Sequence, residues 1–556
     1  MDQHSSDPEV ELDDAPFFEE MVDLSDQRET KNVSFFIGKN NETLWASKPL
    51  SITRKTRSKN IIKTIPGPKG EARKCKSQLD CFLQIISLEM IDEIVNYTNI
   101  YIAKKLAERI ELSETPIRER DYKPTSMSEI KAGFGALFLI AVKRGNRADF
   151  SEYFTKDGTG LIILRGNFSE RRFRLLLRSL RFDNVRTREE RVKIDRLAPI
   201  REFLSKFVGN CQAAYNVGKS LTIDGMLVAF HGRCKFIQYM AQKPAKYGLK
   251  IYALCDSQTF YTYNMQVYCG TQPPGPYVTS NKPYDIVKNL IKPLKLTNRN
   301  VTTDNYFSSY SLAQYLLSVG LTFLGTLRKN KAEIPPEFVS ENKILVAGNH
   351  LFGCNDDSTL ISFATKKKKV VLVLSTLHDD NQVDNETGKP IQIMDYNATK
   401  GGVYTVDLMC SRISTSRRTN RWPMTIFFRT LDIAGINSMR IYQMNNPGET
   451  FPRRDYLKDL AMQLMDENLR ERAKIPNLPK DLSILLKKYM DEENENRCNT
   501  EAVPNKRRFC FICGSRKNNI TKLSCHTCGK SVCQKHSQHR CDNCVMTNKT
   551  SDEDKD

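Results

Sequence analysis

Two aspartates stand where the chain could gather carboxylates around a metal ion. Asp224 follows the apolar run 221–223 and Asp304 follows the short segment 300–303, and both segments are predicted strands. Carboxylates on neighbouring strands can converge, and Mg²⁺ prefers such hard oxygen ligands. A pair of ions can activate a nucleophile on one side of a phosphate and stabilise the leaving oxygen on the other. In a simpler interpretation, Asp224 and Gly225 form a hairpin turn and Asp304 is a helix cap.

A second group of candidate metal ligands lies near the C-terminus, where cysteines and a histidine recur in pairs over the segment 508–546. This segment has too little apolar material to fold by burial alone, and zinc coordination by thiolates and imidazole supplies folding free energy to such modules. Eight ligands predict two structural Zn²⁺ ions in an interleaved arrangement. The predicted sets are Cys510, Cys513, Cys533 and His536 for one ion, and Cys525, Cys528, Cys541 and Cys544 for the other.

Two alternatives remain open for this zinc module. His539 could take the place of His536 as a ligand. The spacing is also compatible with a protein-interaction module of the RING or PHD kind, although the basic residues around the module favour DNA.

The charge of the chain predicts a polyanionic partner. Among 556 residues there are 85 Lys and Arg against 65 Asp and Glu, a net charge of +20. The acids are concentrated in residues 1–30, so the remainder is more basic than this total indicates. Double-stranded DNA is therefore expected as the partner, ahead of a membrane surface.

The sequence carries no signal for export. Its N-terminus is acidic without an apolar secretory segment, and the apolar run around 134–142 is too short for a bilayer of about 30 Å. We expect no membrane partner and no small-molecule substrate, and the sixteen cysteines should stay reduced or bind metal. The basic run 506–508 predicts import into the nucleus.

Four longer strings carry a resemblance to a known family. They read LTIDGMLVAFHGRCKFIQYMAQKPAKYGLKIYALCD (221–256), VTTDNYFSSYSLAQYLL (301–317), DYNATKGGVYTVDLMCS (395–411) and SRRTNRWPM (416–424). From about residue 80 onward the chain resembles the piggyBac-family transposases. The resemblance implies cut-and-paste transposition at TTAA sites by a homodimer that binds transposon ends, with three aspartates as the catalytic triad.

The resemblance also implies an α+β multidomain fold with an RNase H-like catalytic core. The predicted parts are a disordered acidic tail (1–45), a basic arm (46–80), a helical dimerisation and DNA-binding domain in two parts (81–219 and 411–490), the catalytic domain (220–410) with a β-rich insertion at about 330–392, a linker (491–507), the zinc-binding cysteine-rich domain (508–546) and a tail (547–556). The basic arm could lie along phosphates, although an import signal or a solvated linker would look the same.

The predicted triad is incomplete. By resemblance its first two members are Asp224 and Asp304, but the position of the third, directly after Val403, is occupied by Tyr404. A phenol with a pKa near 10 is a neutral and weak ligand at pH 7. Asp407, one helical turn further on, could serve in part, so Asp224, Asp304 and Asp407 are the predicted ligands of Mg²⁺ or Mn²⁺.

An arginine-rich segment follows these residues. It contains Arg412, Arg417, Arg418 and Arg421, and then Trp422. Arginine forks suit phosphates and guanine edges, and an indole ring can stack on an unpaired base. The alternative is a buried core tryptophan beside a basic surface cluster.

Three functions are therefore in competition. The first is a transposase that cuts and joins DNA at TTAA with an incomplete triad. The second is a catalytically inactive, zinc-dependent DNA-binding or regulatory protein. The third is a protein-interaction scaffold built on the zinc module.

Overall fold

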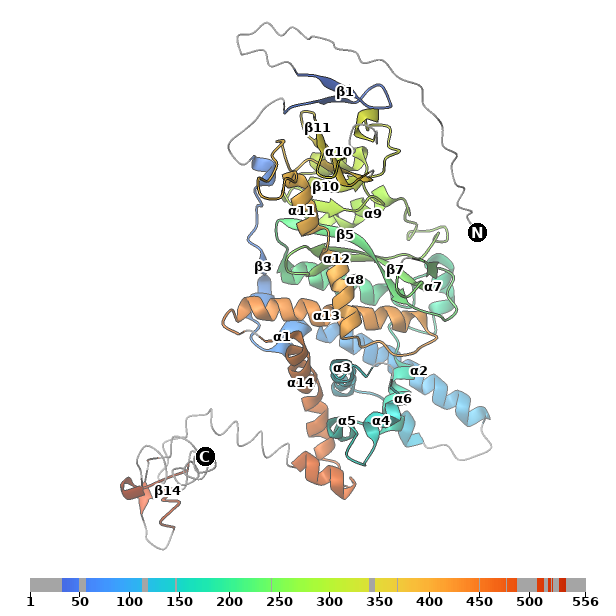
Figure 1. Cartoon of the computed structure of the whole chain (residues 1–556). Coiled ribbons are helices and arrows are strands. Elements are labelled where there is room, and N and C mark those ends of the chain that lie inside the picture. The colour runs from blue at the N-terminus through green and yellow to red at the C-terminus, as the bar shows by residue number, and fades with distance from the viewer. Residues whose placement is uncertain are drawn as a thin grey trace. The chain divides into compact units, whose positions relative to one another are not determined.

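The computed structural model describes most of the chain (Figure 1). The described residues are 33–49, 57–112, 119–145, 148–241, 243–339, 346–367, 369–449, 451–476, 478–487, 508–514, 519–521, 523 and 530–536. They fall into two compact units, one made of residues up to 148 with 175–464, the other of 149–174 with the residues after 464. The acidic segment 1–32, the linker 491–507 and the tail 547–556 lie outside the described residues.

Within the described residues, the first unit is built on a mixed sheet of eleven strands. Across the sheet these are β1 (Phe35–Ile37), β2 (Leu44–Ala46), β11 (His350–Cys354), β12 (Thr359–Lys366), β13 (Lys369–Ser375), β10 (Thr322–Leu327), β9 (Asn300–Thr303), β5 (Ser220–Ala229), β7 (Tyr247–Asp256) and β6 (Gln238–Tyr239), with β8 (Thr262–Val267) also paired to β7. Strands β5, β9 and β10 are parallel, whereas β7 and β8 continue from β5 by antiparallel pairing. Strands β11 to β13, from the predicted β-rich insertion, extend the same sheet from β10.

Helices cover both faces of the sheet around its parallel strands. All four residues of β9 are buried, and because successive side chains point to opposite faces, both faces must be covered there. Helices α11 (Ile391–Thr399) and α12 (Gly402–Arg412) contact β5, α10 (Tyr310–Ser318) contacts β10, and α8 (Arg201–Ala214) and α9 (Pro283–Leu290) contact β8. The sheet therefore provides a rigid support for residues at its strand ends.

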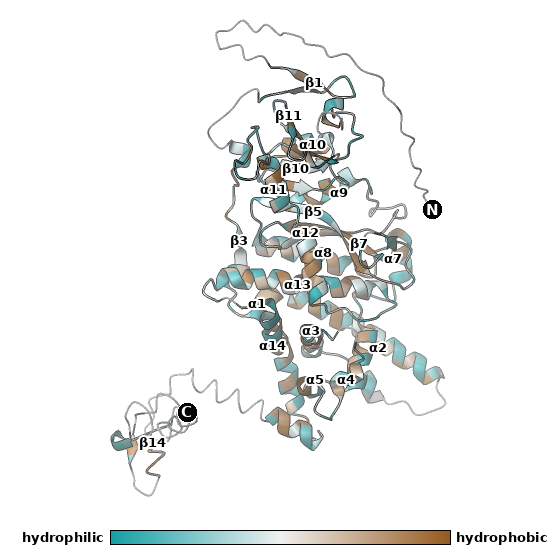
Figure 2. Ribbon diagram, in the orientation of Figure 1, coloured by the Kyte–Doolittle hydropathy of each residue, from teal (hydrophilic) through white to brown (hydrophobic). Residues whose placement is uncertain are grey.

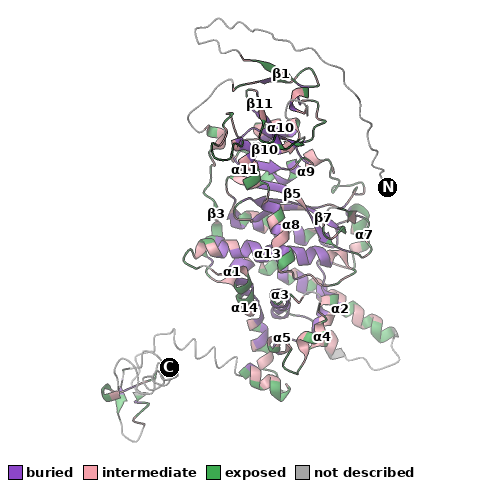
Figure 3. Ribbon diagram, in the orientation of Figure 1, coloured by how far each residue is buried: buried purple, intermediate pink, exposed green. Residues whose placement is uncertain are grey.

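Several other helices of the first unit share a core with the long helix α13 (Trp422–Asn445), which is buried without interruption from Met424 to Met439 (Figure 3). Pro423 stands at its first turn, where a missing N–H costs nothing. Phe427 contacts Phe134, Phe182 and Phe203 with ring centroids 4.8–5.8 Å apart. The helices that share this core are α1 (Gln78–Leu83), α3 (Met127–Val142) and the first part of α14 (Arg453–Ala473), while α2 (Leu88–Leu112) packs on α3. The boundaries between the two units fall within α6 (Glu170–Ser179) and α14, and α7 (Arg188–Ile194) has no buried residue.

Only the N-terminal part of helix α2 is buried in this core. Its last buried residue is Ile102, and the residues after it are largely hydrophilic and exposed (Figures 2 and 3). Only the first half of α2 therefore contributes to the core of the first unit.

The prediction of a disordered tail through residue 45 is wrong for its last part. Strands β1 and β2 form a hairpin, and Ala46 of β2 pairs with Cys354 of β11 at the edge of the sheet. Trp45 is 1% exposed, and its Nε1 donates to the carbonyl oxygen of Glu333 at 2.9 Å. Burial of this large side chain, which composition alone does not reveal, fixes the hairpin.

Part of the predicted basic arm is also attached to the fold. Arg57 and Lys59 form ion pairs with Asp379 at 3.0 and 2.8 Å. The Nδ2 of Asn298 donates to the carbonyl oxygens of Ser58 and Ile61. These two basic side chains are therefore engaged within the protein, which the sequence-based prediction of a phosphate-binding arm did not anticipate.

The second unit contains α4 (Phe150–Phe154), α5 (Ile162–Asn167) and a C-terminal hairpin of β14 (Arg508–Phe509) and β15 (Ile520–Thr521). Phe173 anchors it through ring contacts with Phe150, Phe154 and Phe168. Among the helices that the structure describes, none is long and apolar enough to cross a membrane.

Candidate active site and metal centre

Asp224 lies in the middle of β5, not at its end. It pairs with Ala253 of β7, and Gly225 pairs with Tyr252. The alternative of a hairpin turn at Asp224 and Gly225 is therefore wrong, because the strand continues to Ala229. The backbone N–H of Gly225 donates to the Asp224 carboxylate at 2.6 Å and fixes its orientation.

Asp304 directly follows β9, and its carboxylate accepts from the backbone N–H of Tyr306 at 3.1 Å. The predicted helix-cap alternative is wrong, because Ser309 caps the following helix α10. Ile223 and Thr303 are register partners in the parallel pair β5–β9, so the residues that follow them, Asp224 and Asp304, are neighbours.

One face of the sheet carries both carboxylates. Thr222 shares a face of β5 with Asp224, and its register partner Thr302 lies on the same face. The hydroxyl of Thr222 donates to the carbonyl oxygen of Thr399 at 2.5 Å, and the hydroxyls of Thr302 and Thr399 are 2.8 Å apart. Because Thr399 ends α11, this is the face that α11 and α12 cover.

The two carboxyl groups influence each other. Burial raises the pKa of both Asp224 and Asp304, and the charge of Asp224 raises the pKa of Asp304 further. The positive charges of Lys243 and Lys250 act in the opposite direction at Asp224. Two half-buried carboxylates that repel each other favour a site that gains a cation.

Sequence reasoning missed Lys250 on β7. Its ammonium lies 4.6 Å from the ring centroid of Tyr306 and 4.8 Å from that of Tyr252. Burial lowers its pKa, while Asp224 and Asp304 act in the opposite direction. The residue lies inside one of the family-like strings, but its register partner on β5 is Leu227, so strand pairing alone would not have assigned it to the acidic pair.

Helix α12, which carries Asp407, packs against β5, but the carboxylates of Asp224, Asp304 and Asp407 do not form a close group of the kind seen at the cysteine cluster, whose donor atoms lie within 4.8 Å of one another. A Cβ on Gly402 would come within 2.5 Å of the Thr222 hydroxyl, so the absence of a side chain lets the start of α12 pack against β5. The charge of Asp407 is a lesser cause of the raised pKa of Asp224, behind burial of that carboxyl. Tyr404, at the expected position of the third aspartate, is 63% exposed.

Asp407 already has a partner. Its Oδ1 accepts from the Nη1 of Arg429 at 2.9 Å, and the Arg429 side chain is only 9% exposed. Arg429 belongs to the buried stretch of α13. Asp407 therefore neutralises a buried guanidinium, and this structural role limits its freedom to bind a metal ion.

A pocket adjoins the acidic pair. It has a volume of about 290 Å³ and is lined by Pro283, Asn305, Tyr306, Arg328, Asn330 and Lys331. Asn305 and Tyr306 directly follow Asp304, and the basic residues come from the segment after β10. The sequence analysis did not anticipate this pocket.

Two of the four arginines in the arginine-rich segment bind backbone carbonyl groups of the protein, and the other two are exposed. Arg417 donates its fork to the carbonyl oxygens of Gly145 and Ala148, and Arg421 to those of Arg178 and Leu180, all at 2.6–2.9 Å. These hydrogen bonds connect the arginine-rich segment to residues after the end of α3 and to the C-terminal end of α6. In contrast, Arg412 and Arg418 are exposed.

Trp422 is half-buried at the start of α13. Its ring meets that of Phe236 edge-on, with ring centroids 5.1 Å apart. It is thus neither fully buried in the core nor free on the surface.

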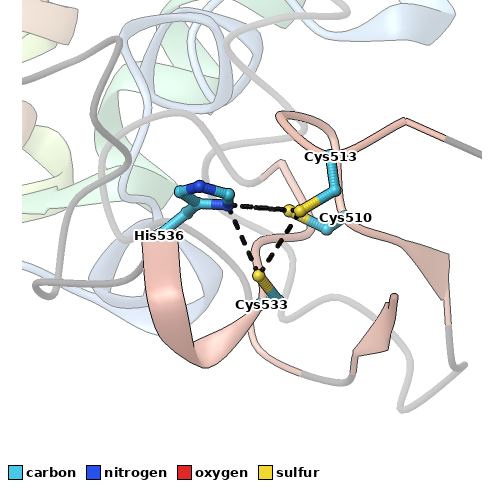
Figure 4. A group of neighbouring side chains, drawn as sticks. All are labelled: Cys510, Cys513, Cys533 and His536. Atoms are coloured by element: carbon cyan, nitrogen blue, oxygen red, sulfur yellow. Dashed lines mark hydrogen bonds between the residues drawn. The ribbon is translucent and has the colours of Figure 1, made fainter. Parts of the chain in front are cut away.

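Four of the eight predicted zinc ligands meet in one cluster (Figure 4). The Sγ atoms of Cys510, Cys513 and Cys533 and a ring nitrogen of His536 all lie within 4.8 Å of one another. The nitrogen that faces the sulfurs is Nδ1, 3.4–3.8 Å from them. This donor set and spacing could hold one metal ion.

The cluster is assembled by short local elements. Cys510 directly follows β14, its N–H donates to the carbonyl oxygen of Asn519, and Gly514 closes the turn with φ +67°. The other predicted set, Cys525, Cys528, Cys541 and Cys544, lies outside the described residues, as does His539.

Comparison with known proteins identifies the family. A family profile described as Transposase IS4 matches residues 77–439, more than half of the chain. A cryo-EM structure of the piggyBac transposase synaptic complex with hairpin DNA superposes with a TM-score of 0.71, is 33% identical, and covers 86% of this chain and 100% of its own. The chain belongs to the piggyBac-type transposase family.

Two human members of this family are also similar. The human PiggyBac transposable element-derived protein 3 is 23% identical over 358 residues, which cover 60% of this chain and 56% of that protein. The human Chimeric ERCC6-PGBD3 protein is also 23% identical over 358 residues, which make up 31% of that protein. The chain thus spans about half or less of these two relatives.

Proposed function

We propose that the chain is a piggyBac-like transposase or a protein derived from one, which binds transposon-end DNA and has TTAA as its target. The observation that carries this proposal is the placement of Asp224 and Asp304 side by side on parallel strands. The likeness to a transposase in complex with hairpin DNA and the basic net charge support DNA as the partner.

The order of the central strands supports an RNase H-like core. Strands β8, β7 and β5 are antiparallel neighbours, and β9 and β10 follow as parallel ones. Asp224 on β5 and Asp304 directly after β9 then occupy neighbouring positions, and α12, which carries Tyr404 and Asp407, packs against β5.

The donors at this site suit Mg²⁺ or Mn²⁺. Asp224 and Asp304 offer carboxylate oxygens, the ligands that these ions prefer, and Asp407 is a weaker third candidate because its Oδ1 accepts from Arg429. When bound, such ions activate water and stabilise the leaving oxygen of a phosphodiester. The protein orients the two carboxylates through the N–H groups of Gly225 and Tyr306.

The residue at position 404 argues against catalysis. Tyr404 offers a neutral, exposed phenol where the family has a carboxylate. The second candidate function, a catalytically inactive DNA-binding or regulatory protein, is favoured by this one observation. In both cases we propose a nuclear, dimeric protein.

DNA binding tests the proposal in either form. We would select sequences from a randomised duplex library and measure affinity for the enriched sequence between 50 and 200 mM salt. If the chain neutralises roughly six phosphates, affinity should fall with a log–log slope of about −5. Absence of enrichment together with a flat salt dependence would contradict the proposed function.

Zinc should be present at two ions per chain, one of them in the cluster of Cys510, Cys513, Cys533 and His536. Cys513→Ser should lower the zinc content by one ion, because a hydroxyl is a poor zinc ligand. Metal analysis of the purified protein measures this, and Cys234→Ser, at a partly exposed cysteine outside the module, is the control. An unchanged zinc content in Cys513→Ser would show that the cluster does not bind zinc.

A further inference from the structure

A pair of exposed tyrosines stands on the β6–β7 hairpin. Tyr239 is 59% exposed and Tyr247 is 49% exposed, and their ring centroids are 4.8 Å apart. They are direct cross-strand partners in the β6–β7 register. The ring of His231, which is also exposed, lies 6.3 Å from that of Tyr247. Large aromatic side chains gathered on a surface in this way indicate a binding site.

Backbone hydrogen bonds pair the strands that carry these tyrosines. The N–H of Met240 donates to the carbonyl oxygen of Lys246 at 2.7 Å, and that of Phe230 donates to the carbonyl oxygen of Tyr247 at 3.3 Å. Both tyrosines therefore lie on hydrogen-bonded strands.

The tyrosines lie on the same face of the sheet as the acidic pair. Ala253 on β7 is the register partner of Asp224 on β5. Tyr247 precedes Ala253 by six residues on β7, and because this number is even, the Tyr247 side chain lies on the same face of the sheet as Asp224. At about 3.3 Å per residue, the tyrosines lie roughly 20 Å along β7 from the level of Asp224. A DNA strand with a phosphate at the acidic pair could reach them within a few nucleotides.

The segment of the chain that carries the pair is also basic, as expected for a surface that binds nucleic acid. The exposed basic residues of the same hairpin region are Arg233, Lys235 and Lys246. Aromatic rings surrounded by basic side chains form stacking platforms for bases, and the cations contact the adjacent phosphates.

We propose that Tyr239 and Tyr247 form a stacking platform for an unpaired base of the DNA strand that is held at the acidic pair. The inference deepens the proposed function and rests on its claim of DNA binding. The platform differs from the arginine-rich segment, because it recognises a base that has left the double helix and not the phosphate backbone of a duplex.

The test compares two DNA probes in the full-length protein. One is the duplex enriched by selection, and the other is the same duplex with a two-nucleotide bulge beside the selected sequence. We expect tighter binding of the bulged probe. Tyr239→Ala and Tyr247→Ala should each weaken that binding by about 5-fold to 150-fold, since stacking contributes about 1–3 kcal/mol per base. Affinity for the paired duplex should change little.

Matched variants separate stacking from other effects. Tyr239→Phe and Tyr247→Phe keep the ring and should bind as the parent does. Tyr277→Ala removes a tyrosine that is 37% exposed outside the platform and should have no effect. Quenching of a 2-aminopurine placed in the bulge should accompany binding and should disappear in the Ala variants.

The outcomes distinguish the two proposals. If the parent binds both probes equally and the Ala variants change neither affinity, the platform is refuted while DNA binding stands. If the Ala variants alter only the oligomeric state in sedimentation, the pair is a protein interface and the inference is wrong. If no probe binds, the proposed function and this inference both fail.

Discussion

Tyr404→Asp is expected to increase Mg²⁺-dependent strand cleavage by at least about 100-fold. The substitution places a carboxylate at the third position of the site, on a helix whose start is packed against β5 through Gly402 and Thr222. Incomplete or displaced catalytic geometry costs on the order of 10² in rate. Because Tyr404 is 63% exposed, its replacement should remove little packing and leave stability nearly unchanged.

The measurement is cleavage of a supercoiled plasmid that carries the selected sequence beside TTAA, in the presence of Mg²⁺ or Mn²⁺. Tyr404→Asn, which adds a neutral side chain of similar size, is the control and should not gain activity. Asp224→Asn in the Tyr404→Asp background should abolish the gain. Equal cleavage by the parent and by Tyr404→Asp would show that the site is already complete with Asp407, and DNA binding without cleavage by either would favour the inactive, regulatory function.

The acidic pair shows what local patterns can predict. Apolar, β-branched segments before Asp224 and Asp304 predict two strands, and a carboxylate after each is visible in the sequence. That Asp224 is internal to β5 depends on its pairing with β7 on one side and with β9 on the other. Register of this kind joins residues about thirty to eighty positions apart, so a local pattern does not contain it.

The arginine-rich segment shows where such reasoning stops. The sequence does not distinguish an exposed arginine from one that binds backbone carbonyl groups. The carbonyl groups that Arg417 and Arg421 bind belong to residues more than 200 positions earlier in the chain, so no local pattern reveals them. The same limit explains the hairpin of residues 35–46, which is attached through Trp45 to Glu333. In contrast, the cluster that includes Cys513 and His536 followed from short spacings, because metal coordination imposes them locally.

Asp407→Ala is expected to lower the free energy of unfolding by about 3 kcal/mol, because it removes the carboxylate that forms an ion pair with the buried guanidinium of Arg429. Asp407→Asn should cost only about 1 kcal/mol, since an amide oxygen can still accept from Nη1. Urea unfolding followed by fluorescence measures both, because the two tryptophans of the chain, Trp45 and Trp422, lie in the unit that contains this ion pair.

The double variant Asp407→Ala/Arg429→Met decides between an ion-pair role and a ligand role for Asp407. If the aspartate mainly neutralises Arg429, removing both charges should recover most of the lost stability, because a buried apolar side chain replaces an unpaired charge. If Asp407→Ala is as stable as the parent but abolishes cleavage in the Tyr404→Asp background, Asp407 acts as a metal ligand and the ion pair is incidental. The expected pattern instead assigns Asp407 to holding α12 against α13, and the third ligand to position 404.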